Sequence, residues 1–190
     1  MGIVARKNYL FLSVSCGYLV NKKKEIKTGA YEGTIIDIRE VEDEFEGKKI
    51  AKIEVKMQDN QSDEIAVIKF TLESWYAIGF FARISKIDLT KPFIIGTLPS
   101  EQNEKMSFCY IKQEGITKVE ADKEFPKPEK VEIGTKKAPK QVYSWIKPLE
   151  AIEKIMADLK SKIVVAPVVA APAEAAPVTT GSGKEDDLPF

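Results

Sequence analysis

The sequence predicts a mainly β domain followed by one helix and a polar tail, and three observations support this prediction. Between residues 31 and 119, several stretches alternate apolar and polar residues with a period of two, which is typical of strands. Near residue 145 the apolar residues change to steps of three and four, which is typical of an amphipathic helix. Beyond residue 163, alanine, proline and valine dominate, and no pattern that builds a core remains.

The clearest β pattern is a pair of strands joined by a loop that contains a glycine. The first strand covers residues 34 to 39, and the second covers residues 50 to 57. The second strand places four apolar side chains on one face and Lys52, Glu54 and Lys56 on the other. The pattern therefore predicts a hairpin with one face in solvent.

The other elements of the domain are predicted from the same periodicities. An early strand from Tyr9 to Val20 has large side chains on both faces, so both faces could contact the core. After the hairpin come a buried strand at residues 64 to 71, a short helix within residues 72 to 87, and strands at residues 92 to 98, 106 to 112 and 116 to 119. Three strands, a helix and two strands form the element order of an OB-fold, a small barrel that binds oligonucleotides. We therefore expect an OB-fold-like five-stranded barrel within residues 1 to 122, although other small β barrels and sandwiches share much of this order.

Four segments follow the predicted barrel. Residues 123 to 141 are rich in lysine, glutamate and proline, and predict an exposed connector. Residues 142 to 163 predict an amphipathic helix that packs against the barrel, with self-association through a coiled coil as the alternative. Residues 164 to 183 predict a disordered Ala/Pro-rich linker, and residues 184 to 190 an acidic tip. The apolar stripe of the helix consists of Trp145, Leu149, Ile152, Met156, Leu159 and Ile163.

Composition limits the classes of function. The chain has 29 basic and 29 acidic side chains and no histidine, which excludes His-based triads, imidazole general bases and His-Cys zinc sites. We expect no enzyme activity, metal or cofactor. The two cysteines favour a reducing cytoplasm. Residues 6 to 16 imitate a lipoprotein signal, but their apolar run is short and interrupted by serine.

The last six residues form the most specific motif, in which three acids precede an aliphatic residue, a proline and a phenylalanine. This motif resembles the C-terminal tip of bacterial and phage single-stranded DNA-binding proteins. An aromatic ring can enter an apolar pocket while carboxylates meet the basic side chains around it, and a flexible tether lets the tip reach several partners. The resemblance implies recruitment of replication, recombination and repair proteins, whereas a tail that only maintains solubility is the alternative. The partner-binding candidates are Glu185, Asp186, Asp187, Leu188, Pro189 and Phe190.

A second resemblance covers about residues 9 to 120. Residues 84 to 92 read Ile-Ser-Lys-Ile-Asp-Leu-Thr-Lys-Pro, and residues 108 to 115 read Phe-Cys-Tyr-Ile-Lys-Gln-Glu-Gly. Together they resemble a group of phage-encoded single-stranded DNA-binding proteins. This resemblance implies a role in replication of a phage genome, and hence a location in the cytoplasm of the host.

Binding of single-stranded DNA requires basic side chains that contact phosphates and aromatic rings on which bases stack. The phosphate-binding candidates are Arg39, Lys48, Lys49, Lys52, Lys56, Lys69 and Lys112. The stacking candidates are Phe45, Trp75, Tyr76, Phe108 and Tyr110, although each ring is individually favoured as part of the core. The clusters at residues 22 to 24 and 48 to 49 are equally compatible with solvated turns.

The expected function is sequence-nonspecific binding and protection of single-stranded DNA, with recruitment of other proteins through the tip. One alternative is an adaptor or virion-associated β protein that docks a host factor through its tail and does not bind nucleic acid. A small nuclease is disfavoured, because histidines and paired acids are lacking.

Overall fold

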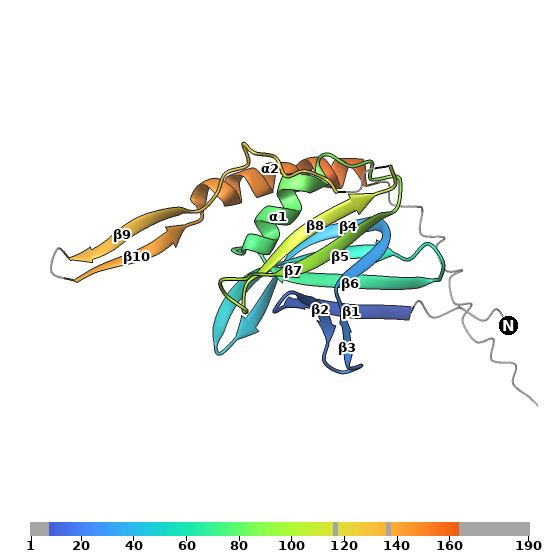
Figure 1. Ribbon diagram of the computed structural model, residues 1–190, viewed down its shortest axis with the longest axis horizontal. Helices are drawn as coiled ribbons and strands as arrows, with labels where there is room; N and C mark the ends of the chain where they lie inside the picture. The colour runs from blue at the N-terminus through green and yellow to red at the C-terminus, as the bar shows by residue number, and fades with distance from the viewer. Residues whose placement is uncertain (1–7, 116–117, 136–137, 164–190) are drawn as a thin grey trace, which may run out of the picture.

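The computed structural model describes residues 8–115, 118–135 and 138–163, and it is mainly β with a curled, half-barrel sheet (Figure 1). The sheet has eight strands in the order β3-β2-β1-β6-β5-β4-β7-β8. They are β1 (Asn8–Ser15), β2 (Tyr18–Asn21), β3 (Ile26–Thr28), β4 (Ala30–Phe45), β5 (Lys48–Gln58), β6 (Glu64–Thr71), β7 (Phe93–Pro99) and β8 (Ser107–Gln113). The other elements are α1 (Trp75–Ile84), α2 (Ile146–Lys162) and a separate hairpin of β9 (Glu129–Thr135) and β10 (Ala138–Ser144).

Strands β4, β5 and β6 form an antiparallel meander that contains the predicted stretches, although β4 extends well beyond the predicted residues 34 to 39 at both ends. Glu46 and Gly47 join β4 to β5 with φ angles of 52° and 72°. Two successive positive φ angles are typical of the type I′ turn, which matches the twist of a hairpin. The register of β4 shifts between Ile35 and Asp37, and such an irregularity bends a strand.

Residues 9 to 20 form a hairpin rather than the single predicted strand. Cys16 and Gly17, with φ angles of 49° and 77°, turn the chain back so that β2 pairs antiparallel with β1. Strand β1 also pairs in parallel with β6. Leu10 and Leu12 are buried, whereas the alternate side chains are exposed, so only one face of β1 contacts the core.

The β1–β2 turn connects distant strands of the curled sheet. The backbone N–H of Gly17 donates a hydrogen bond to Oγ of Ser107 at 2.8 Å. The hydroxyl of Thr97 donates to the carbonyl oxygen of Gly17 at 2.6 Å. A Cβ atom at Gly17 would lie 2.6 Å from the backbone nitrogen of Pro99, so the close approach requires glycine. These contacts fix β1 and β2 relative to β7 and β8.

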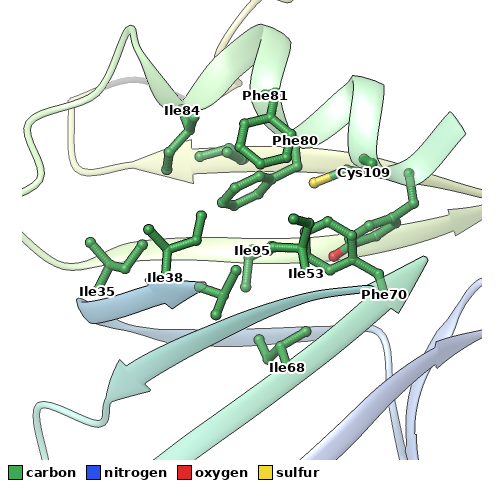
Figure 2. Packing of buried hydrophobic residues seen from close by; sticks show 14 of the residues in the cluster. Ile35, Ile38, Ile53, Ile68, Phe70, Phe80, Phe81, Ile84, Ile95 and Cys109 are labelled. Atoms are coloured by element: carbon green, nitrogen blue, oxygen red, sulfur yellow. The ribbon is translucent and has the colours of Figure 1, made fainter. Parts of the chain in front are cut away.

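Helix α1 lies over the inner face of the sheet and begins at a Ser74 cap, whose Oγ accepts a hydrogen bond from the backbone N–H of Ala77 at 3.1 Å. Phe80 and Phe81 are fully buried. The ring centroid of Phe80 lies 5.4 Å from that of Phe70 on β6. Figure 2 shows Phe80 and Phe81 above isoleucines of the sheet. The predicted helix within residues 72 to 87 is therefore confirmed.

Helix α2 confirms the second helical prediction over most of its length, but residues 142 to 144 of the predicted helix belong to β10. Its Ile152, Met156 and Leu159 side chains are buried in the same core, and α2 contacts α1 and β4. Packing against the main domain, the favoured expectation for this helix, is therefore confirmed. In the described ranges, neither helix is long and apolar enough to span a membrane.

Three expectations differ from the structure. The sheet has eight strands rather than five, because β1, β2 and β3 extend it beyond β6. Residues 123 to 141, predicted as a connector, include β9 and part of β10, which form a hairpin that extends away from the sheet (Figure 1). Lys118 and Val119 are not in a strand, and the rest of the strand predicted at residues 116 to 119 lies outside the described residues. The linker and the tip also lie outside them.

Candidate functional site

The candidate site lies on the outer face of the sheet, which is the face turned away from α1. Cross-strand pairing places Phe11 opposite Val67, and Glu54 opposite both Lys69 and Arg39. Side chains at such paired positions point to the same face. The outer face therefore includes Tyr9, Phe11 and Ser13 of β1, Val67 and Lys69 of β6, Lys52, Glu54 and Lys56 of β5, and Asp37 and Arg39 of β4.

A buried carboxylate lies in the middle of this face. Glu54 is only 4% exposed. Nε of Arg39 donates a hydrogen bond to Oε1 of Glu54 at 2.8 Å, and Nζ of Lys69 lies 3.5 Å from Oε2. The two cations compensate the charge of the carboxylate, which would otherwise be costly to bury. Arg39 and Lys69 are thus already engaged within the protein.

Two further predicted phosphate-binding residues also have acidic partners. Nζ of Lys52 lies 2.8 Å from the Asp43 carboxylate, and Nζ of Lys56 lies 2.9 Å from the Asp37 carboxylate. The hydrogen bond and charge of Lys52 lower the pKa of Asp43 below its ordinary value. The outer face of β4, β5 and β6 therefore carries alternating charges rather than a continuous basic surface.

A groove of about 680 Å³ lies at one side of the outer face, beside the β1–β2 hairpin. Three aromatic side chains line it: Tyr9 is 43% exposed, Phe11 57% and Phe45 61%. The rings of Tyr9 and Phe11 stack with centroids 6.2 Å apart. Rings that are this exposed do not belong to the core, and they offer stacking surfaces to a planar ligand.

The charged side chains that line this groove are all lysines, and we call it the basic groove. Lys22, Lys23 and Lys24 come from the turn after β2, and Lys52 comes from β5. Oδ1 of Asn21 accepts hydrogen bonds from the backbone N–H groups of Lys23 and Lys24, at 3.0 Å each. These bonds hold the turn in place and keep its lysines beside the aromatic rings.

The predicted DNA-binding residues at the end of the β4–β5 hairpin point to two different faces of the sheet. Phe45 and Lys52 line the basic groove, and Lys48 is paired with Phe45 across the hairpin. Lys49 instead points to the opposite face, where its Nζ lies 2.9 Å from the Glu42 carboxylate. Lys49 is therefore not part of the groove.

Phe108, Tyr110 and Lys112 form a separate group on the outward face of β8. The Tyr110 ring lies over Gly96 of β7, where a Cβ atom would collide with it. Nζ of Lys112 lies 5.5 Å from the centroid of that ring. None of the three lines the basic groove. These three predicted DNA-binding residues therefore lie apart from Phe45 and Lys52, the predicted residues that line the groove.

The prediction that Tyr76 stacks on DNA bases is wrong. Tyr76 is 2% exposed, and its ring centroid lies 5.0 Å from that of Phe70. Burial raises its pKa well above the ordinary value. Its ring belongs to the core, whereas the adjacent Trp75 is only half-buried and contacts the rings of Tyr143 and Trp145, each with a centroid distance of 6.3 Å.

Sequence reasoning missed five of the seven aromatic and basic residues that line the basic groove: Tyr9, Phe11, Lys22, Lys23 and Lys24. The alternation of aromatic and leucine residues from position 9 to position 12 was a usable signal for one exposed face. The position of that face beside Phe45 depends on the parallel pairing of β1 with β6, for which the sequence carries no local signal.

No family model, curated protein or solved structure matches this chain. Its function is therefore inferred from the chemistry of the groove and from the sequence motifs.

Proposed function

We propose that this protein binds single-stranded DNA without sequence preference, and that the basic groove holds the strand. The observation that supports this proposal is the combination of three exposed aromatic rings with Lys22, Lys23 and Lys24 in one groove that no acidic residue lines. A fourth lysine of the groove, Lys52, is paired with Asp43. Lysines attract phosphates, and every base has a face that can stack on an aromatic ring. Such contacts do not depend on sequence.

The arrangement of the strands is consistent with an OB-like fold, which forms part of the proposal. Strands β4, β5 and β6, then α1, then β7 and β8 follow the element order of that fold. OB-folds bind oligonucleotides beside their second and third strands and at the loop that follows the first strand. Lys52 of β5 and Phe45 at the end of β4 occupy corresponding positions.

Single strands fit the groove better than duplex DNA for two reasons. The bases of a duplex are stacked on one another and cannot reach rings such as Phe11 and Phe45. A duplex also carries about one charge per 1.7 Å of its axis, whereas the lysines of the outer face outside the groove, such as Lys56, are paired with acids such as Asp37. This face therefore lacks the continuous basic surface that a long, highly charged partner requires.

The test is fluorescence anisotropy with labelled oligo-dT and with a duplex of equal length. We expect preferential binding of oligo-dT, with affinity that falls as salt rises. Replacing Lys22, Lys23 and Lys24 by alanine should reduce the slope of log K against log salt by about 2, since each lost phosphate contact contributes about 0.7.

The matched control replaces three exposed lysines outside the groove, Lys123, Lys154 and Lys160, by alanine, and should leave the slope unchanged. Equal losses in the two triple variants would contradict the assignment of the groove. Absence of binding to either DNA would favour the adaptor function instead.

We also propose, on the two sequence resemblances alone, that residues 184 to 190 recruit replication, recombination and repair proteins in the cytoplasm of a phage host. Deletion of these residues should abolish binding to a replication protein that recognises such tips. It should leave oligo-dT binding unchanged or tighter, because an acidic tip competes with phosphates. Partner binding that survives the deletion would contradict the assignment of the tip.

A further inference from the structure

A second pocket, of about 270 Å³, lies next to the basic groove and contains both tryptophans of the chain. Trp75 comes from the start of α1, and Trp145 directly precedes α2. Thr71 ends β6, and Lys105 belongs to the loop between β7 and β8. All four line the pocket, which we call the tryptophan pocket. Four separate parts of the fold thus converge there.

The tryptophan pocket and the basic groove share a wall. Val14, near the end of β1, lines both. Thr71 of the pocket is the direct cross-strand partner of Lys52 of the groove. Directly opposed Cβ atoms in an antiparallel pair lie about 4.5 to 5.5 Å apart. A polymer in the groove therefore reaches the pocket by crossing the ends of β1 and β6.

The side chains of the tryptophan pocket suit a nucleotide. The ring centroids of Trp75 and Trp145 lie 6.3 Å apart, with the rings inclined by 64°, and both residues are only half-buried. Partly exposed indole rings offer apolar surface to a base. Lys105 is exposed and forms no ion pair within the described ranges. Glu73 also lines the pocket and is its only acidic residue.

The geometry points to a continuous path: single-stranded DNA that occupies the basic groove continues into the tryptophan pocket, where a base stacks on an indole ring. This inference rests on the proposed function and extends it, because it assigns a second nucleotide subsite. It also implies that short oligonucleotides fill only the groove, whereas longer ones occupy both.

The chain offers one optical reporter for the tryptophan pocket and another for the path as a whole. Trp75 and Trp145 are the only tryptophans, so intrinsic tryptophan fluorescence reports on the pocket. Cys16 is exposed and follows Ser15, which lines the groove, whereas Cys109 is buried. Gly17, the next residue, is hydrogen-bonded to Ser107 of the tryptophan pocket, so a fluorophore attached to Cys16 reports on DNA anywhere along the path.

The experiment titrates the full-length protein with oligo-dT of about 4 and about 16 nucleotides, the range of site sizes of one OB-fold. We expect both lengths to change the fluorophore signal and only the longer one to quench tryptophan emission. The Trp75→Phe and Trp145→Phe variants should each retain quenching of the remaining indole. Lys105→Ala should lower the salt slope for the longer oligonucleotide by about 0.7 and leave the shorter unaffected.

Lys86→Ala is the matched control, because Lys86 is exposed just beyond the other end of α1 and lines neither the pocket nor the groove. It should change neither slope. If anisotropy shows binding of the longer oligonucleotide while tryptophan emission is unchanged, or changes equally with both lengths, the path is overturned and the proposed function stands. If anisotropy shows no binding at all, both are overturned.

Discussion

The guanidinium of Arg39 donates two hydrogen bonds to one carboxylate oxygen of Glu54, and that carboxylate is almost completely buried. Lys69 approaches the second oxygen of the same carboxylate. The arrangement keeps the two basic side chains on the outer face and neutralises part of their charge. Glu54 therefore limits how strongly Arg39 and Lys69 interact with a phosphate near this face.

Glu54→Gln should tighten binding of oligo-dT. The amide retains an acceptor oxygen but removes the negative charge, so Arg39 and Lys69 become available to phosphates. The slope of log K against log salt should steepen by about 0.7 to 1.4, which corresponds to one or two additional phosphate contacts. Anisotropy titrations at several salt concentrations measure this slope.

Glu42→Gln is the matched control for that substitution. Glu42 pairs with Lys49 on the opposite face of the same hairpin, and both side chains are exposed. Its loss should change neither the affinity nor the slope. An equal gain in the two variants, or no gain in Glu54→Gln, would contradict the prediction.

Phe11→Leu and Phe45→Leu should each weaken oligo-dT binding by about 5- to 150-fold, because stacking of one base on an aromatic ring contributes about 1 to 3 kcal/mol. Both rings are exposed, and leucine retains apolar cover over the strand. The urea midpoint should therefore stay nearly unchanged. Leu98→Ala, an exposed apolar residue outside the basic groove, should affect neither measurement. A similar loss of affinity in Leu98→Ala would argue against stacking in the groove.

Gly96→Ala should destabilise the fold, because a Cβ atom would collide with the ring of Tyr110. The colliding atoms lie at the outer end of the half-buried Tyr110 ring, so the ring must leave its place over Gly96, and we expect a cost of about 1 kcal/mol. In a Tyr110→Ala background this cost should disappear, since the colliding ring is gone. Urea unfolding of the wild type, the two single variants and the double variant measures this difference in cost.

Gly29→Ala is the control for this cycle, because no atom lies within 4 Å of a Cβ at that position. It should change stability by less than about 0.5 kcal/mol. Tyr110→Ala should leave oligo-dT affinity unchanged, since Tyr110 does not line the basic groove. A loss of affinity in Tyr110→Ala would mean that the DNA path includes the outward face of β8.

Stability should decline at alkaline pH. Burial raises the pKa of Cys109 from 9.0 to about 12 and that of Tyr31 from 10.0 to about 12. The unfolded chain therefore loses these protons first as pH rises, and deprotonation stabilises the unfolded state. The contribution of the protonated groups is complete below about pH 9 and is lost between about pH 9 and 12, at up to about 1.4 kcal/mol per pH unit for the buried Cys109 thiol and at a smaller rate for Tyr31, which is only partly buried.

Cys109→Ala should remove the part of this decline that begins near pH 9 and leave the part that begins near pH 10, which belongs to the two tyrosines with raised pKa, Tyr31 and Tyr76. Urea unfolding across this pH range measures the decline. Cys16→Ala should retain the full profile, because Cys16 is exposed. A thiol reagent should accordingly react with Cys16 in the folded protein and with Cys109 only after unfolding. Identical pH profiles for the two variants would contradict the role of Cys109.

The sequence by itself determined the elements whose signals are local. The alternation from position 50 to position 57 specified the inner and outer faces of β5, and the turn at Glu46 and Gly47 specified the hairpin. The spacing of Ile152, Met156 and Leu159 specified the buried face of α2. These signals depend only on backbone periodicity and turn chemistry within a few residues. The proposal of a C-terminal tip that recruits other proteins likewise rests on the sequence alone.

Only the tertiary structure decided which of these elements meet. An exposed strand edge can pair with many partners, and the sequence of β1 does not specify that Phe11 pairs with Val67. That pairing brings β1 and the lysine turn beside Phe45, and it creates the basic groove. The acidic partners of the predicted phosphate-binding residues, such as Asp37 for Lys56, could not be predicted from the sequence either, because cross-strand neighbours are distant in sequence. Local patterns thus define the strands, whereas the packing of the whole core selects their neighbours and therefore the site.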